Sequence, residues 1–139
     1  MATRHHARMA VVSLLYAYDV GNGDIADFSD EILESKKIRN KQRDFALTLF
    51  DGVLVNLDTI DKAISKHLVD WEFERLGSLE RAILRLGTYE ILFSSLDSAV
   101  IINEAIEVTK AFATEQSPKF INGVLDSLSK DKELIQQKK

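Results

Sequence analysis

Residues 76–93 have the sequence LGSLERAILRLGTYEILF, and this stretch decides the fold class of the chain. Apolar residues recur along it at helical spacing, and further apolar residues cover its other sides. A helix that is apolar nearly all round is usually buried by several neighbours. Ser78 is the expected N-cap, and Glu80 falls in the first turn, where the helix dipole favours a negative charge. The main stripe consists of Leu79, Ala82, Ile83, Leu86, Glu90 and Phe93. We therefore expect the central helix of an all-α domain.

The composition is that of one compact domain. The chain has 139 residues, of which 45% are hydrophobic, with one proline and six glycines. These values suit a substantial core with little linker. The absence of cysteine excludes disulfides and thiolate metal sites and agrees with a reducing cytoplasm. No apolar run approaches the ~18 residues that indicate a membrane span. We expect a compact bundle of about six to seven helices over residues 1–129 and a polar, frayed tail over residues 130–139.

Start and stop signals divide the rest of the chain into further helices. Thr3 is the expected N-cap of a first helix that runs to about Val20. Later helices are expected to start at Ser29, at Asn40, at Asp97 or Ser98, and at Ser117-Pro118, with an interruption near Asn56–Thr59. The expected buried face of the helix over residues 99–113 comprises Ile101, Ala105, Val108 and Phe112. Gly52 lies within the apolar stripe of the third helix, where glycine costs up to ~1 kcal/mol relative to alanine. It therefore predicts a close helix crossing.

The charges are unevenly distributed along the chain. The net charge is −4, yet residues 1–18 contain Arg4 and Arg8 and no acid. Residues 19–35 contain six acids and no Lys or Arg, and residues 36–43 contain five Lys or Arg and no acid. The acidic average can therefore hide a basic face. The plainer alternative for residues 36–43 is a solvated helix end and loop, and the sequence does not choose between the two.

A second apolar stripe on the first helix allows two interpretations. Met9, Val12 and Tyr16 lie well around the helix from its core face. The stripe either contacts a second neighbour in the bundle, which we favour, or forms a partner-binding surface.

The usual catalytic motifs are absent from the sequence. There is no glycine-rich phosphate loop, no cysteine nucleophile and no serine in an elbow motif. His5 and His6 are adjacent, so on a helix they point about 100° apart, which suits a shared metal poorly. Glu90 within its apolar stretch is interpreted as a structural acceptor, which is paired with an arginine or caps a neighbouring helix, rather than as a perturbed acid. We therefore expect neither an enzyme nor a metal or cofactor site.

Three segments together resemble a known family. They are RHHARMAVVSLLYAYD over residues 4–19, LERAILRLGTYEI over residues 79–91, and VIINEAIEVTKAFATEQSPKFINGVLD over residues 100–126. They resemble the NusB family of bacterial transcription antitermination factors. The resemblance implies two packed helical subdomains without catalysis. It also implies binding of single-stranded boxA RNA in ribosomal-RNA leaders, together with the ribosomal protein NusE. The expected setting is the transcribing RNA polymerase complex with other Nus factors, in the cytoplasm. The family includes monomers and dimers, so a homodimer remains open.

The resemblance also assigns candidate site residues. The expected RNA-binding residues are Arg4, His5, His6, Arg8, Gln116, Lys119 and Phe120. Arginine and lysine supply cations for phosphates, and an aromatic ring can stack on an unpaired base. Tyr16 and Glu80 match family positions that affect partner association. The chain departs from the family pattern where His5 and His6 occupy places at which arginine is common. The rival interpretation is a helical adaptor that binds only proteins, through Met9, Val12 and Tyr16.

Overall fold

The computed structural model describes residues 3–21, 23–112 and 118–136, and all regular structure in these ranges is helical, which confirms the all-α prediction. The α-helices are α1 (Arg4–Asp19), α2 (Ser29–Ser35), α3 (Asn40–Val55), α4 (Leu57–Lys66), α5 (Ser78–Phe93), α6 (Ser98–Phe112), α7 (Pro118–Ser129) and α8 (Lys132–Gln136). Two 3-10 helices, η1 (Gly23–Phe28) and η2 (Phe73–Arg75), lie in the connections.

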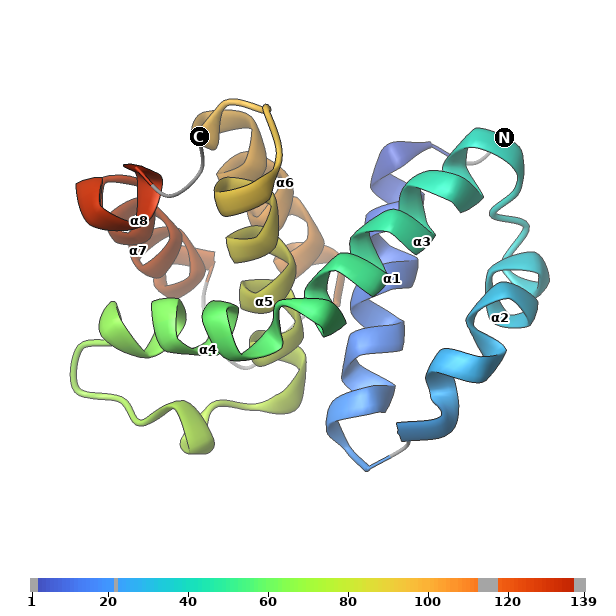
Figure 1. Ribbon diagram of the computed structural model, residues 1–139, viewed down its shortest axis with the longest axis horizontal. Coiled ribbons are helices and arrows are strands. Elements are labelled where there is room, and N and C mark those ends of the chain that lie inside the picture. The colour runs from blue at the N-terminus through green and yellow to red at the C-terminus, as the bar shows by residue number, and fades with distance from the viewer. Residues whose placement is uncertain (1–2, 22, 113–117, 137–139) are drawn as a thin grey trace.

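The helices form two packed groups, as expected (Figure 1). α1, η1, α2 and α3 lie on one side of the molecule, and α4 to α8 lie on the other. α5 belongs to the second group but also packs against α1 and α3 of the first. Its side chains are buried on nearly every side, and Leu84 and Leu86 are 0% and 4% exposed. The prediction that residues 78–93 form the central helix is therefore confirmed.

The close helix crossing predicted from Gly52 lies between α3 and α5. A Cβ atom added to Gly52 would overlap the ring of Tyr89, far inside van der Waals contact. The glycine leaves room for the end of the Tyr89 side chain of α5 against the α3 backbone.

Helix boundaries agree with the sequence signals to within about one residue. Thr3 caps α1 in a capping box with His6, α2 begins at Ser29, and α3 and α4 are interrupted at Asn56. Two caps differ from expectation. Arg39 rather than Asn40 precedes α3, and Gly77 rather than Ser78 precedes α5.

The polar tail differs from its predicted frayed state, because residues 132–136 form α8. Asp131 caps this helix, since its Oδ1 accepts from the backbone N–H groups of Glu133 and Leu134. Its Oδ2 accepts from Lys66 Nζ at 2.8 Å and His67 Nε2 at 2.7 Å, on the end of α4. These two hydrogen bonds hold the pKa of Asp131 well below its usual value. The anchor lies more than 60 residues upstream, so local composition could not reveal it.

Within the described ranges, no helix has the length and apolar character needed to cross a membrane. The same ranges contain no group of three or more His, Cys, Asp or Glu residues placed to hold a metal ion.

Candidate nucleic-acid interface

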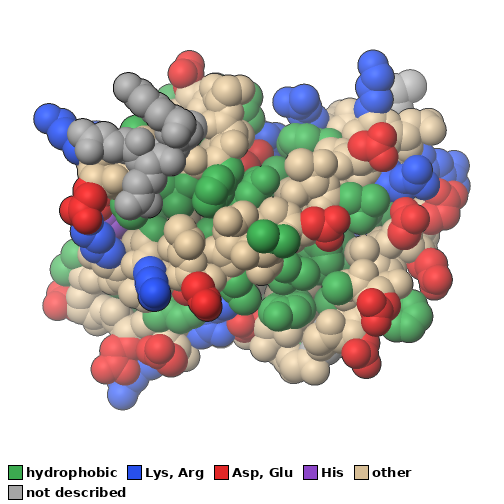
Figure 2. All heavy atoms as spheres, viewed as in Figure 1, with side chains coloured by type: hydrophobic (Ala, Val, Ile, Leu, Met, Phe, Trp, Pro, Cys, Tyr) green, Lys and Arg blue, Asp and Glu red, His purple; other side chains and the backbone are tan. Residues whose placement is uncertain are grey.

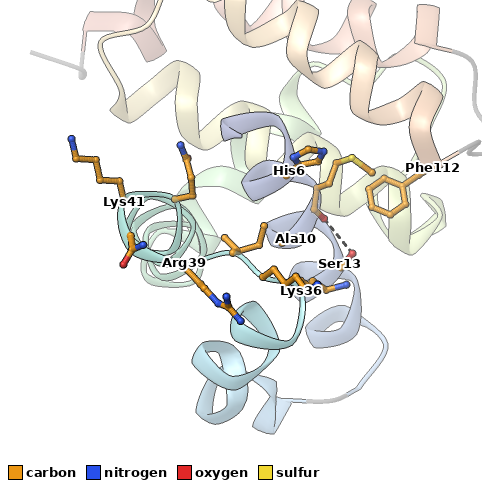
Figure 3. A pocket seen from close by; sticks show the side chains of 12 residues that line it. His6, Ala10, Ser13, Lys36, Arg39, Lys41 and Phe112 are labelled. Carbon is orange, nitrogen blue, oxygen red and sulfur yellow. Dashed lines mark hydrogen bonds between the residues drawn. The ribbon is translucent and has the colours of Figure 1, made fainter. Parts of the chain in front are cut away.

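An open groove of about 1020 Å³ lies beside the first half of α1. α1 forms one wall with Met9, Ala10 and Ser13, and the connection from α2 to α3 forms the other (Figure 3). Phe112, at the end of α6, closes one side of the groove. The lining is completed by His6, Lys36, Lys37, Ile38, Arg39, Asn40, Lys41 and Gln42. The groove therefore combines apolar surface with a cationic edge.

No acidic residue lines this groove, whereas four cations do. Arg39 is paired with Glu34 at 2.8 Å, and both side chains are more than half exposed. In the part of the chain that the structure describes, Lys36, Lys37 and Lys41 form no ion pair, and Lys41 points away from the protein (Figure 3). The three lysines of the basic run are therefore exposed, and they border a groove next to the N-terminal end of α1.

The shape of the cationic edge comes from the way α2 ends. The Ile38 N–H donates to Leu33 O and the Lys37 N–H donates to Glu34 O, both at 2.9 Å, which is a Schellman motif. Ile38 is buried and anchors the turn in the core. Lys37 adopts the left-handed conformation with a φ of 61°, at a position that usually holds glycine. The buried anchor and the turn together place Lys36, Lys37 and Arg39 around the rim.

Arg4 and Arg8 share one side of α1 but have different surroundings. Arg4 is exposed, and its Cζ lies 4.6 Å from the centre of the Phe45 ring on α3. Arg8 is only 6% exposed and forms a two-pronged pair with Glu90 of α5, with Nη2–Oε1 at 2.8 Å and Nε–Oε2 at 3.1 Å. The assignment of Arg8 to an RNA phosphate is therefore corrected, because its donors face a buried carboxylate. The interpretation of Glu90 as an acceptor for an arginine is confirmed.

The two adjacent histidines also separate. His5 Nδ1 lies 2.7 Å from Glu104 Oε1 on α6, so His5 connects α1 to α6. His6 is exposed, lines the groove and completes the capping box with Thr3. Of the two candidates, His6 is therefore the one placed at the groove.

The C-terminal candidates lie outside the groove lining. Lys119 is exposed at the start of α7, and Phe120 is half-buried with its ring centre 5.9 Å from that of Trp71. Gln116 lies outside the described residues. Phe112 was expected on a buried face, but it is partly exposed at the groove. Phe112 stands at the end of α6, where the sequence becomes polar, and this position could have indicated that its side chain is partly exposed.

The two candidate partner-binding residues differ in exposure. Tyr16 is 44% exposed on α1 and is accessible to a partner. Glu80 is 6% exposed, and its carboxylate oxygen lies 2.6 Å from where a Cβ of Gly77 would stand. Glu80 therefore packs against the first turn of α5 and lacks the exposure that a direct contact needs. Val12 is fully buried within the bundle, whereas Met9 is partly exposed at the groove and Tyr16 is 44% exposed, so only part of the stripe of Met9, Val12 and Tyr16 is covered by the bundle.

Comparison with known proteins identifies the family. The NusB family model matches residues 5–130, which is most of the chain. The chain belongs to the NusB family. A transcription antitermination protein NusB of Sulfurimonas denitrificans is 75% identical, with 95% of this chain and 100% of the relative covered. One of Nitratiruptor sp. is 62% identical, with 94% of each covered. Members of the family are transcription antitermination factors, and this chain is one by membership.

Solved structures agree with this assignment at the level of the fold. A crystal form of T. maritima NusB superposes with a TM-score of 0.85 at 36% identity, covering 97% of this chain and 98% of that one. A complex of the antitermination factors NusB and NusE with double-stranded RNA superposes with a TM-score of 0.82 at 33% identity, covering 91% of this chain and 96% of that one. The fold of this NusB-family chain is thus shared with proteins solved together with RNA.

Proposed function

We propose that the chain binds single-stranded boxA RNA of ribosomal-RNA leaders and that the groove beside α1 holds the RNA backbone. It does so together with the ribosomal protein NusE, within a transcribing RNA polymerase complex that contains other Nus factors. This complex supports processive transcription of ribosomal-RNA operons in the cytoplasm. The observation that carries the proposal is a groove edged by cations and free of acids, in a NusB-family chain whose net charge is −4.

The groove offers the two kinds of contact that single-stranded RNA requires. Lys36, Lys37 and Lys41 have no carboxylate partner in the described residues, so their charges are available to phosphates. Phe112 and His6 offer rings on which a splayed base can stack. Lys119 and Phe120 extend the same chemistry outside the groove. The apolar surface of Met9 and Ile38 supports base contacts between the cations.

The conformation of Lys37 supports a role for its side chain. A left-handed φ costs roughly 1–2 kcal/mol for a residue other than glycine. A glycine would relieve this strain, yet the sequence keeps a lysine there, and such strain tends to persist at functional positions. Lys37→Gly should therefore leave folding unchanged or stabilised while weakening RNA binding.

NusE is the proposed protein partner, and Tyr16 is the proposed contact on α1. The rival function, an adaptor that binds only proteins, needs a broad exposed stripe on α1, and burial of Val12 reduces that stripe to Tyr16 and part of Met9. A homodimer is compatible with the proposal provided that the groove remains open.

Fluorescence anisotropy tests the proposal. A labelled boxA RNA and a scrambled RNA are titrated at several salt concentrations, with and without NusE. We expect tighter binding of boxA, strengthened by NusE, and a log–log salt slope that falls by roughly 0.7 in Lys36→Ala and again in Lys41→Ala. Lys62→Ala is the matched control, since Lys62 is exposed on α4 and does not line the groove. Equal binding of the two RNAs by the folded protein with NusE present would leave the protein-only adaptor as the better explanation.

A further inference from the structure

A row of four side chains leads from the centre of the protein to the N-terminal end of α1. Glu90 of α5 holds Arg8 of α1, Arg8 Cζ lies 5.1 Å from the centre of the Phe45 ring, and Arg4 Cζ lies 4.6 Å from the same centre. Glu90 and Arg8 are buried, Phe45 is partly buried and packs against the core, and Arg4 is exposed. One aromatic ring on α3 therefore contacts two guanidinium groups that lie one helical turn apart.

The two guanidinium groups differ in how their charge is balanced. Arg8 donates to both carboxylate oxygens of Glu90, so its charge is neutralised and its position is set. Arg4 has no carboxylate or carbonyl partner in the described part of the chain, and its interaction there is with the Phe45 ring. A carboxylate would orient Arg4 but would also cancel its charge and occupy its donors. An aromatic face orients a guanidinium while leaving the charge and all five donors available.

We infer that Phe45 is a positioning residue for RNA binding, which holds the Arg4 side chain in place to meet an RNA phosphate. The inference rests on the proposed function. It assigns a role in RNA binding to Phe45 of α3, which acts through Arg4 and need not contact the RNA itself. A free arginine side chain loses much rotamer freedom when it binds a ligand. Holding it against the ring before RNA arrives reduces that loss and thereby increases affinity without adding charge.

The position of Arg8 strengthens this arrangement. Arg8, which is buried, also packs against the ring, and Glu90 fixes Arg8 through three hydrogen bonds. The ring thus rests on a rigid buried pair, so its orientation does not depend on the exposed end of α1. Arg4 gains a fixed support on a helix terminus that would otherwise fray.

A double-mutant cycle separates positioning from simple packing. The variants are Phe45→Leu, which fills the space without a ring, Phe45→Tyr, which keeps the ring, Arg4→Ala, and Phe45→Leu with Arg4→Ala. Binding of the boxA RNA is measured by anisotropy at several salt concentrations, after each variant's folding has been checked by circular dichroism and denaturation. Phe45→Leu should weaken RNA binding by about 2- to 5-fold, as expected for loss of an exposed cation–π contact. Phe45→Tyr, which keeps the ring, should bind RNA with the affinity of the wild type.

The salt dependence distinguishes this role from loss of a charge. Phe45→Leu should leave the log–log salt slope unchanged, because Arg4 still reaches the phosphate, whereas Arg4→Ala should lower it by roughly 0.7. In the Arg4→Ala background, Phe45→Leu should have no further effect on affinity. An equal loss in both backgrounds, or wild-type affinity in folded Phe45→Leu, would overturn the inference. If Phe45→Leu does not fold, Phe45→Met takes its place in the cycle.

A measurement without RNA keeps the inference separate from the proposed function. The side-chain protons of Arg4 in the free protein should show an upfield ring-current shift in the NMR spectrum that is retained in Phe45→Tyr and lost in the leucine or methionine variant. Absence of this shift in the wild type would overturn the positioning role even if boxA binding is specific. Presence of the shift with no preference for boxA over scrambled RNA would refute the proposed function and, with it, the role of Phe45 in RNA binding.

Discussion

Two regions beside α1 treat charge in opposite ways. Toward α5, charges are paired: Arg8 binds Glu90, and Asp19 accepts from Arg81 at 2.8 Å and from Arg85 at 3.1 Å. Arg85 also binds Asp61, and each of these arginine side chains is at most 14% exposed. Around the groove, Lys36, Lys37 and Lys41 are exposed and have no carboxylate partner among the described residues. Arg4, at the N-terminal end of α1, is likewise exposed and has no carboxylate partner there. Figure 2 shows one face of the molecule, with acidic side chains gathered along the edge where Figure 1 places η1 and α2.

The difference shows that pairing and burial, rather than residue type, separate structural cations from cations whose charge is available to a ligand. A buried charge has lost its water, so removing its partner leaves an uncompensated charge and destabilises the fold. An exposed cation keeps its hydration and contributes little to folding, and its charge remains available to a ligand. Substitutions in the two regions should therefore affect different measurements.

The largest effect is expected at the buried pair. Glu90→Leu leaves the Arg8 guanidinium without its carboxylate, and we expect the free energy of unfolding to fall by roughly 3–5 kcal/mol in chemical denaturation. The matched control is the double variant Arg8→Met with Glu90→Leu, which removes both charges and should recover most of the loss. A loss in the single variant below about 0.5 kcal/mol, typical of a surface change, would show that Arg8 is hydrated and that the comparison fails.

The next largest effect is expected at Asp19, whose contribution to stability should depend on pH. Burial raises the pKa of Asp19, but hydrogen bonds from Ser78 and Arg81 and the charges of Arg81 and Arg85 outweigh it and lower the pKa overall. The pKa of an aspartate in the unfolded chain is about 3.9. Because the pKa of Asp19 is lower in the folded protein, its ionised carboxylate stabilises the fold fully above that pH. This stability is lost as the pH falls through the pKa of the folded state.

Asp19→Asn should therefore be less stable than the wild type at pH 7, by about 1.5–3 kcal/mol for hydrogen bonds to charged groups. The difference should shrink as the pH is lowered below 4, and denaturation curves between pH 7 and pH 3 measure this. A difference that stays constant across this range would mean that Asp19 contributes through packing alone.

Arg4 provides the test among the exposed cations. Arg4→Ala should change the free energy of unfolding by less than about 0.5 kcal/mol, since the side chain is exposed. It should nevertheless lower the log–log salt slope of RNA binding by roughly 0.7. Arg8→Lys, provided that it folds, should leave that slope unchanged because the group faces Glu90. A reduced slope in Arg8→Lys would show that Arg8 reaches RNA.

The smallest effect is expected at the terminal helix α8, which Asp131 connects to the end of α4. Asp131→Asn removes the charge that caps α8 and accepts from Lys66 and His67. We expect faster amide hydrogen exchange over residues 132–136 with no change in the global unfolding transition, because α8 is short and terminal. Lys130→Ala is the control, since its pair with Asp126 does not hold α8. A shift of the global transition in Asp131→Asn would make α8 an integral part of the core.

Several features followed from the sequence because they depend on neighbours within one or two helical turns. The apolar periodicity of residues 78–93 predicted the central helix, Thr3 predicted the start of α1, and Gly52 predicted a close crossing. The uneven charge distribution predicted a basic surface, and the three family segments predicted membership of the NusB family. Each of these signals is local or is read directly from residue order.

Only the tertiary structure decided which cations are available. Arg4 and Arg8 lie on the same side of α1, so their positions in the sequence do not distinguish them. Glu90 of α5, more than 80 residues away in the chain, binds Arg8 and not Arg4. In the same way, packing of α2 against α3 brings the basic run beside α1, and Asp131 finds its partners on α4. Charge pairing depends on distances of a few ångströms between segments far apart in sequence. Periodicity and composition contain no information about those distances.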